Sequence, residues 1–122
     1  MFANCTSLTS IPIKNISYIN AYGCCEMFKG CTSIPATLPA NITSSDITQF
    51  TEGCFSGMFK DCINLVNSRS LYLGPSTSYL ENDCFSEMFA ECHKLTATPY
   101  LSAIALAPNC YRGMFINCSS LL

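Results

Sequence analysis

The sequence has little charge, no tryptophan and a single histidine, and these shortages remove whole classes of function. Only 11% of its 122 residues are charged, and the six Lys and Arg stand singly along a chain of net charge -2. Nucleic-acid binding depends on grouped cations that neutralise phosphates. We therefore expect no nucleic-acid partner.

Long apolar runs are missing as well. No stretch approaches the roughly 20 apolar residues that a membrane-spanning helix needs, so we expect no membrane insertion. The opening stretch MFANCTSL lacks the charged and apolar regions of a signal peptide. Any export signal is expected to lie outside this chain.

What the sequence does have is an internal repeat built on the pair Met-Phe. The pair occurs five times, and its methionines are Met1, Met27, Met58, Met88 and Met114. A cysteine follows each Phe by three residues, and Leu or Ile follows each of these cysteines by three, so the unit reads MF..C..L. We predict one domain over residues 1–122, with four to five coils that start near these pairs.

The nonapeptide CFSGMFKDC, from Cys54 to Cys62, recurs in similar form at 84–92 and 110–118. At about 100° per residue, its Cys, Phe and Met side chains share an arc of about 140°. The spacing predicts a short amphipathic helix that is stable only when its apolar stripe is buried, because isolated helices of this length are marginal. The residues expected to form the core of the repeat are Met27, Phe28, Cys31, Cys54, Met58, Phe59, Cys62, Cys84, Met88, Phe89, Cys92, Cys110, Met114, Phe115 and Cys118.

A segment of extended character follows each expected helix. These segments are LTSIPI from Leu8, IPATL from Ile34, LVNSRSLYL from Leu65 and LTATPYL from Leu95. We predict short strands here, limited by prolines that cannot donate ladder hydrogen bonds. Helix, strand and return loop in repetition give an α/β repeat solenoid, a leucine-rich-repeat-like stack of short parallel strands and short helices.

The stretches MFANCTSLTSIP, MFKGCTSIPATLPA and CYRGMFINCSSL resemble the BspA-like leucine-rich repeats of bacterial surface proteins, which also occur in parasitic protists and in phages of gut bacteria. The resemblance covers essentially all 122 residues. It implies a leucine-rich-repeat solenoid that serves in surface attachment or protein binding, and it brings no catalytic residues. The second copy departs from the pattern, with Gly23 in place of the leading cysteine and Cys24 in place of the aromatic residue.

The ten cysteines have two interpretations. Their even number and an extracellular setting favour disulfides. Against this, the two cysteines of one nonapeptide would lie about 12 Å apart along a helix, beyond the reach of a disulfide. Free thiols that pack as small hydrophobic groups are the interpretation we favour. If one bridge forms, the irregular neighbours Cys24 and Cys25 are its first candidates.

Neither a metal site nor a catalytic site is expected. The cysteine spacings do not match the closely spaced pairs of zinc ligands, and His93 is the sole histidine. His93 follows Cys92 directly, but neighbours at a helix end point in different directions, so a thiol with an adjacent base is not indicated. Glu87 and Glu91 fit a solvated polar face. The sequence predicts no enzyme and no cofactor.

The first and last repeats share one phase, without an atypical coil at either end. We therefore expect the array to continue beyond this chain, or to pack end to end with further repeats or with another chain.

The polar surface that remains suggests two functions. The first is a binding module of a surface or secreted protein, located at the cell surface or outside the cell, that mediates adhesion through protein or glycan contacts. The alternative is a structural spacer or a virion component, such as a phage fibre or decoration protein. Binding predicts that Tyr72, Tyr79 and Tyr100 cluster on one exposed face, whereas a spacer predicts scattered polar positions.

Overall fold

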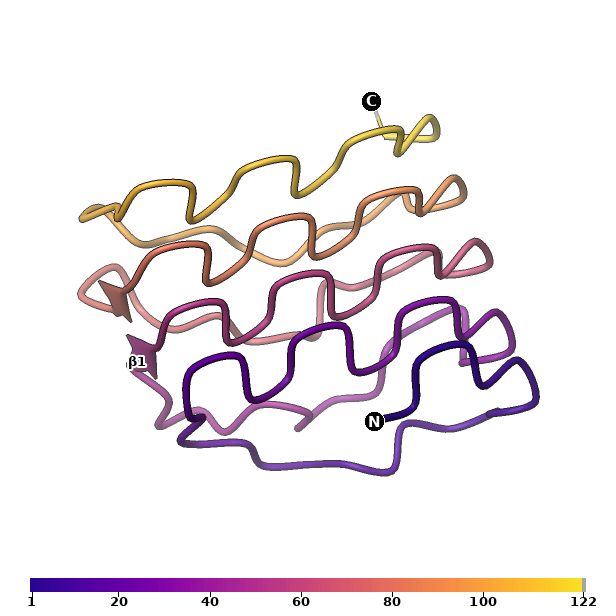
Figure 1. The fold of residues 1–122 in the computed structure, drawn as a ribbon, viewed down its shortest axis with the longest axis horizontal. Coiled ribbons are helices and arrows are strands. Elements are labelled where there is room, and N and C mark those ends of the chain that lie inside the picture. Colours follow the sequence, from indigo (N-terminus) through magenta and orange to yellow (C-terminus); the bar gives the residue numbers. More distant parts are fainter. Residues whose placement is uncertain (122) are drawn as a thin grey trace.

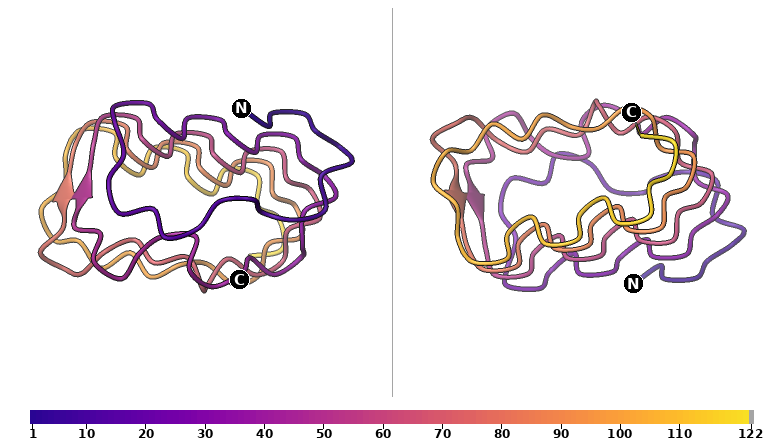
Figure 2. Two further views of the ribbon diagram at one scale, coloured as in Figure 1. Left: turned by 90° about the horizontal axis from the view of Figure 1, so that it is seen from below. Right: turned by 90° about the horizontal axis from the view of Figure 1, so that it is seen from above.

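The computed structural model describes residues 1–121, and they form two layers (Figures 1 and 2). The front layer consists of tightly folded turn segments, which lie side by side and are joined by more extended return segments at the back. The turn segments comprise residues 1–5, 20–31, 51–62, 81–92 and 107–118. The return segments comprise residues 8–19, 34–50, 65–80 and 95–106.

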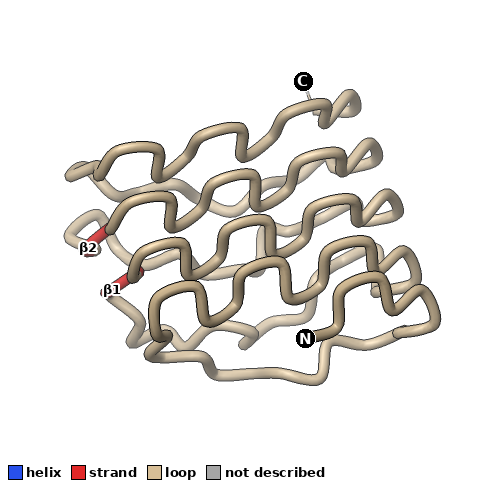
Figure 3. The backbone as a smooth tube through the Cα atoms, in the orientation of Figure 1, coloured by secondary structure: helices blue, strands red, loops and turns tan. Residues whose placement is uncertain are grey.

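Regular secondary structure is almost absent from residues 1–121. They contain no helix, and the only strands are β1 (Gln49–Phe50) and β2 (Tyr79–Leu80), which pair in parallel with Gln49 opposite Tyr79 and Phe50 opposite Leu80 (Figure 3). Turns and loops make up the rest. The expected fold class, an α/β repeat solenoid of short helices and short parallel strands, is therefore wrong.

The nonapeptide that was expected to be helical is a series of overlapping β-turns. The Met58 N–H donates to the Phe55 carbonyl and the Lys60 N–H to the Gly57 carbonyl, each at 3.1 Å and each reaching back three residues. Gly57 and Asp61 both have a φ of 60°. A right-handed helix requires negative φ at every residue, so these left-handed residues exclude it.

The intervening N–H groups donate to the neighbouring turn segment. Gly57 N–H donates to Ser86 C=O at 2.8 Å, and Phe59 N–H donates to Met88 C=O at 2.9 Å. The same direction holds between all neighbouring turn segments, with each donating to the one that follows it in the chain. These long-range bonds take the place of the i to i−4 bonds of a helix. Each turn segment is consequently held by its neighbours.

The prediction of a short strand directly after each expected helix is also wrong. Apart from the β1–β2 pair, parallel pairing between the described return segments consists of isolated bridges, which join Thr37 to Asn67, Asn67 to Ala97 and Ile16 to Thr43. Prolines interrupt these segments, and a proline has no N–H to donate to a ladder. β1 and β2 lie at the other end of their return segments, just before the next turn segment.

Stacked aromatic rings run through the core between the two layers. Phe28, Phe59 and Phe89 form the centre of one column, with neighbouring ring centroids 5.6 and 5.7 Å apart and nearly parallel planes. Phe2 and Phe115 continue this column at its two ends. Offset stacking of this kind adds to the stabilisation that ring burial alone provides.

The structure places most of the expected core residues inside this layer pair. Met27 and Phe115 are half-buried and the other thirteen are buried. The half-buried pair lies toward the two ends of the stack, where fewer neighbouring segments cover the side chains.

The chain is cysteine-rich, and all ten cysteines are free thiols, Cys24 and Cys25 included. One column of thiols donates to carbonyls of the preceding turn segment: Cys62 to Phe28 at 3.2 Å and Cys92 to Phe59 at 3.2 Å. Burial raises the pKa of Cys62 and of Cys84 to about 12. Loss of water around a thiol disfavours the thiolate, which is the nucleophilic form. These buried thiols are therefore packing groups and poor nucleophiles.

Candidate binding groove

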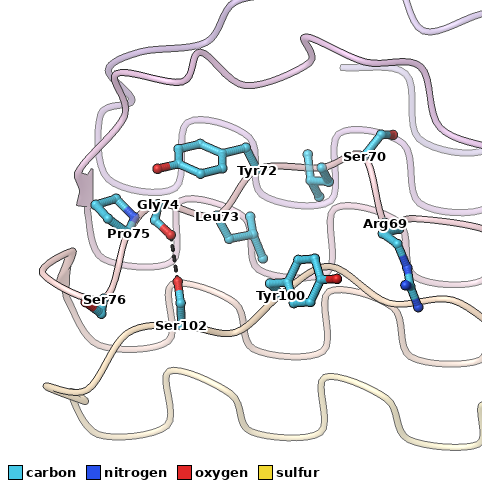
Figure 4. Close-up of a pocket in the computed structure, with 10 residues that line it drawn as sticks. Arg69, Ser70, Tyr72, Leu73, Gly74, Pro75, Ser76, Tyr100 and Ser102 are labelled. Atoms are coloured by element: carbon cyan, nitrogen blue, oxygen red, sulfur yellow. Dashed lines mark hydrogen bonds between the residues drawn. The ribbon is translucent and has the colours of Figure 1, made fainter.

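A groove of about 360 Å³ lies on the back layer, between residues 69–76 of one return segment and residues 100–102 of the next (Figure 4). Its polar and aromatic lining consists chiefly of Arg69, Ser70, Tyr72, Tyr100 and Ser102. We refer to it as the tyrosine groove.

Hydrogen bonds between return segments fix the shape of this groove. Ser102 Oγ donates to the Gly74 carbonyl at 2.8 Å, which ties its two walls together (Figure 4). Thr43 of the preceding return segment holds the main chain of Tyr72: its Oγ1 donates to the Tyr72 carbonyl at 2.6 Å and accepts from the Tyr72 N–H at 3.1 Å. Ser70 Oγ donates to the Leu38 carbonyl at 2.6 Å. The backbone beneath the tyrosines is therefore set by contacts with the return segment of the preceding repeat.

Gly74 allows the sharp bend at one end of the groove. Its φ of 84° lies in the left-handed region, which glycine adopts without a steric penalty. A Cβ at this position would overlap the Ser78 hydroxyl and approach the Phe50 ring to 2.9 Å. Any larger residue would displace the wall that carries Tyr72.

Two tyrosines and one arginine give the groove its chemistry. Tyr100 is 73% exposed and Tyr72 is 37% exposed. The Arg69 guanidinium lies over the Tyr100 ring, 5.8 Å from its centroid, in a cation–π contact. Among residues 1–121, no carboxylate forms an ion pair with Arg69. The groove thus combines aromatic faces with an uncompensated positive charge.

The acidic residues lie elsewhere on the molecule. Apart from Asp46, all of them belong to turn segments: Glu26, Glu52, Asp61, Glu81, Asp83, Glu87 and Glu91. The back layer therefore carries little negative charge to compete for Arg69.

Of the three tyrosines that were expected to share a face, the structure brings two together. Tyr72 and Tyr100 line the tyrosine groove, whereas Tyr79, which is 72% exposed, lies on β2 beside a separate hollow formed with Thr48, Gln49 and Thr77. Tyr72 and Tyr100 belong to the two adjacent return segments that form the walls of the groove, whereas Tyr79 lies on β2, just before the next turn segment.

Arg69 is not among the residues predicted to bind, because in the sequence it is one of several isolated cations. A signal was available in the repeat spacing. A shift by one repeat places Arg69 and Ser70 beside Pro99 and Tyr100, since Asn67 bridges to Ala97. Aligning the return segments, in addition to the Met-Phe pairs, would have shown the arginine next to the tyrosine.

Residues that could support other chemistry do not converge. The His93 ring lies against the Asn117 carbonyl, with Nδ1 at 3.0 Å, and its Nε2 is 3.5 Å from a Glu91 carboxylate oxygen. Within residues 1–121 there is no cluster of three or more His, Cys, Asp or Glu side chains suited to a metal ion. The same part of the chain has no helix with the length and apolarity needed to span a bilayer.

Comparison with known proteins returns no relative: no family model matches the chain, and neither a curated protein nor a solved structure matches it.

Proposed function

We propose that this chain is a non-enzymatic binding module of a surface or secreted protein, and that it mediates adhesion through the tyrosine groove by contact with a glycan or a protein. The observation that supports this most is the meeting of Tyr72, Tyr100 and Arg69 in one concave site. Tyrosine and arginine are enriched at the energetic centres of interfaces, because they offer large contact areas together with polar groups. The resemblance to BspA-like repeats points to the same setting.

Binding to immobilised mucin and immobilised fibronectin, measured by biolayer interferometry, tests this proposal. The double variant Tyr72→Ala/Tyr100→Ala is expected to lose at least tenfold in affinity for whichever surface the chain binds. Tyr18→Ala is the matched control, because Tyr18 is also highly exposed but lies outside the groove. Equal binding by the double variant and the control would contradict a role for the groove. Failure to bind either surface would contradict the adhesion proposal.

A second candidate function, a structural spacer or virion component, is supported by the direction of the backbone bonds. Since each turn segment donates to the next one, the segment at 107–118 presents a row of N–H groups at its outer edge. Within residues 1–121, those of Tyr111, Gly113 and Phe115 have no hydrogen-bond partner. The half-buried Phe115 ring ends the aromatic column at the same edge. Such an edge favours end-to-end packing with further repeats or with another chain.

Sedimentation velocity over a range of protein concentrations distinguishes this second candidate. End-to-end packing predicts a sedimentation coefficient that rises with concentration, and Phe115→Glu should abolish the rise by placing a charge against the column. Ile116→Glu is the control, because Ile116 is already exposed and lies outside the aromatic column. A single monomeric species at all concentrations would contradict packing between copies.

A further inference from the structure

We propose that the tyrosine groove binds a saccharide that bears a carboxylate group, with the carboxylate on Arg69 and a sugar ring against Tyr100 and Tyr72. This inference rests on the proposed binding function and adds the chemical class of the ligand.

The positive charge of Arg69 favours an anionic ligand. Lys60 of the front layer is within 3.4 Å of Glu87, but Arg69 has no such partner within the described residues. Its guanidinium is instead held over the Tyr100 ring. A cation–π contact does not use the guanidinium N–H donors as hydrogen bonds to a polar atom, and these donors match the two oxygens of a carboxylate. An anion bound there would supply the charge partner that residues 1–121 do not provide for Arg69.

The serine hydroxyls of the groove favour a ligand that donates hydrogen bonds. The Ser70 proton is committed to the Leu38 carbonyl and the Ser102 proton to the Gly74 carbonyl. Each hydroxyl oxygen keeps its acceptor capacity, so its next partner has to be a donor. Sugar hydroxyls are donors, whereas the ionised side chain of Asp or Glu only accepts. The two serines and Arg69 together therefore fit a ligand with both hydroxyl groups and a carboxylate.

The main chain at Tyr72 and Gly74 is not available to an extended peptide. A peptide that binds by strand addition needs free backbone N–H and C=O groups along an edge. Here Thr43 occupies the N–H and the C=O of Tyr72, and Ser102 occupies the Gly74 carbonyl. At these two residues recognition therefore relies on side chains, and the exposed tyrosine rings offer apolar surfaces for the C–H faces of a sugar ring.

Isothermal titration calorimetry with matched acidic and neutral probes tests the inference. The acidic probes are trigalacturonate and sialyllactose, and their neutral counterparts are methyl-esterified trigalacturonate and lactose. We expect at least one acidic probe to bind at least tenfold more tightly than its counterpart, with affinity that falls as salt is added. Arg69→Gln should lower the affinity for that acid about tenfold and leave the neutral sugar unaffected. Tyr100→Ala should weaken both.

Arg112→Gln is the control, because Arg112 is an exposed arginine outside the groove, and it should bind like the unaltered chain. Equal affinities for acidic and neutral probes, or no response to Arg69→Gln, would overturn the acidic ligand. Absence of binding to both acids would also overturn it. In each case, groove-dependent binding to mucin or fibronectin would leave the proposed binding function standing, so the two failures can be told apart.

Discussion

Replacement of Gly57 by alanine tests whether the nonapeptide is a series of turns or a helix, because the two structures predict changes of opposite sign in the free energy of unfolding. Gly57 is buried in the middle of residues 54–62 and has a φ of 60°. A Cβ added there would lie 3.1 Å from Cγ of Glu26, on the preceding turn segment. The exposed Glu26 side chain can shift to relieve this contact, so the backbone conformation dominates the cost.

The expected magnitude follows from that conformation. An L-residue in the left-handed region costs about 1–2 kcal/mol, so Gly57→Ala should lower the free energy of unfolding by about that amount. In a helix the same substitution would raise the free energy of unfolding by about 1 kcal/mol, since alanine is the better helix former. The two structures therefore differ by about 2–3 kcal/mol.

Urea denaturation followed by tyrosine fluorescence measures this difference. Ser56→Ala is the matched control, because Ser56 precedes Gly57 but lies outside the left-handed positions, and it should change stability by less than about 0.5 kcal/mol. Gly57→Asn should cost less than Gly57→Ala, since asparagine tolerates positive φ better. A Gly57→Ala variant more stable than the unaltered chain would refute the turn structure.

The remaining predictions concern the core. Phe59→Ala should lower the free energy of unfolding by about 3–5 kcal/mol, because the fully buried ring stacks on both sides. Phe115→Ala should lower it clearly less, because Phe115 is half-buried and has one stacking partner. Equal losses in urea denaturation would contradict the aromatic column. Iodoacetamide at pH 8 followed by mass spectrometry should label exposed Cys5 in the native chain and label Cys62 only after unfolding; rapid labelling of every thiol would contradict the burial. Stability should fall as the pH rises above 9, because the folded chain holds the protons of Cys62 and Cys84, each with a pKa of about 12, while the unfolded thiols lose theirs near 9.0. The stability that these two thiols contribute is fully present below pH 9 and is lost toward pH 12. Urea midpoints at pH 7.5 and 10.5 measure this loss, and Cys84→Ala should make the stability depend less on pH.

Which side chains of the nonapeptide face inward could be worked out from spacing, but the backbone conformation could not. Cys54, Met58 and Cys62 recur every four residues, and all three are fully buried. A helix has 3.6 residues per turn. Over so short a segment, a period of 3.6 residues and a period of 4 residues place almost the same side chains on one face. The spacing of buried residues therefore does not distinguish a helix from a series of overlapping β-turns.

A local signal for the turns was present in part of the sequence. Gly57, Asp61 and Asn117 occupy left-handed positions, and Gly, Asp and Asn are the residues that tolerate them best. Glu87 and Glu91 occupy the equivalent positions with φ of 54° and 64°, although glutamate has no such preference. Local propensity therefore does not account for the conformation of that segment.

The sequence by itself determined the spacing of the Met-Phe pairs, the small number of charges and the identity of the apolar side chains. The tertiary structure decided the turn conformation, because it is held by N–H to C=O bonds between segments one repeat apart in the chain, such as Phe55 to Cys84 at 2.9 Å. It also decided that Arg69 meets Tyr100, since residues so distant in the chain become neighbours only when the return segments lie side by side. Hydrogen bonds and contacts of this range depend on all the segments at once, and no local stretch of sequence encodes them.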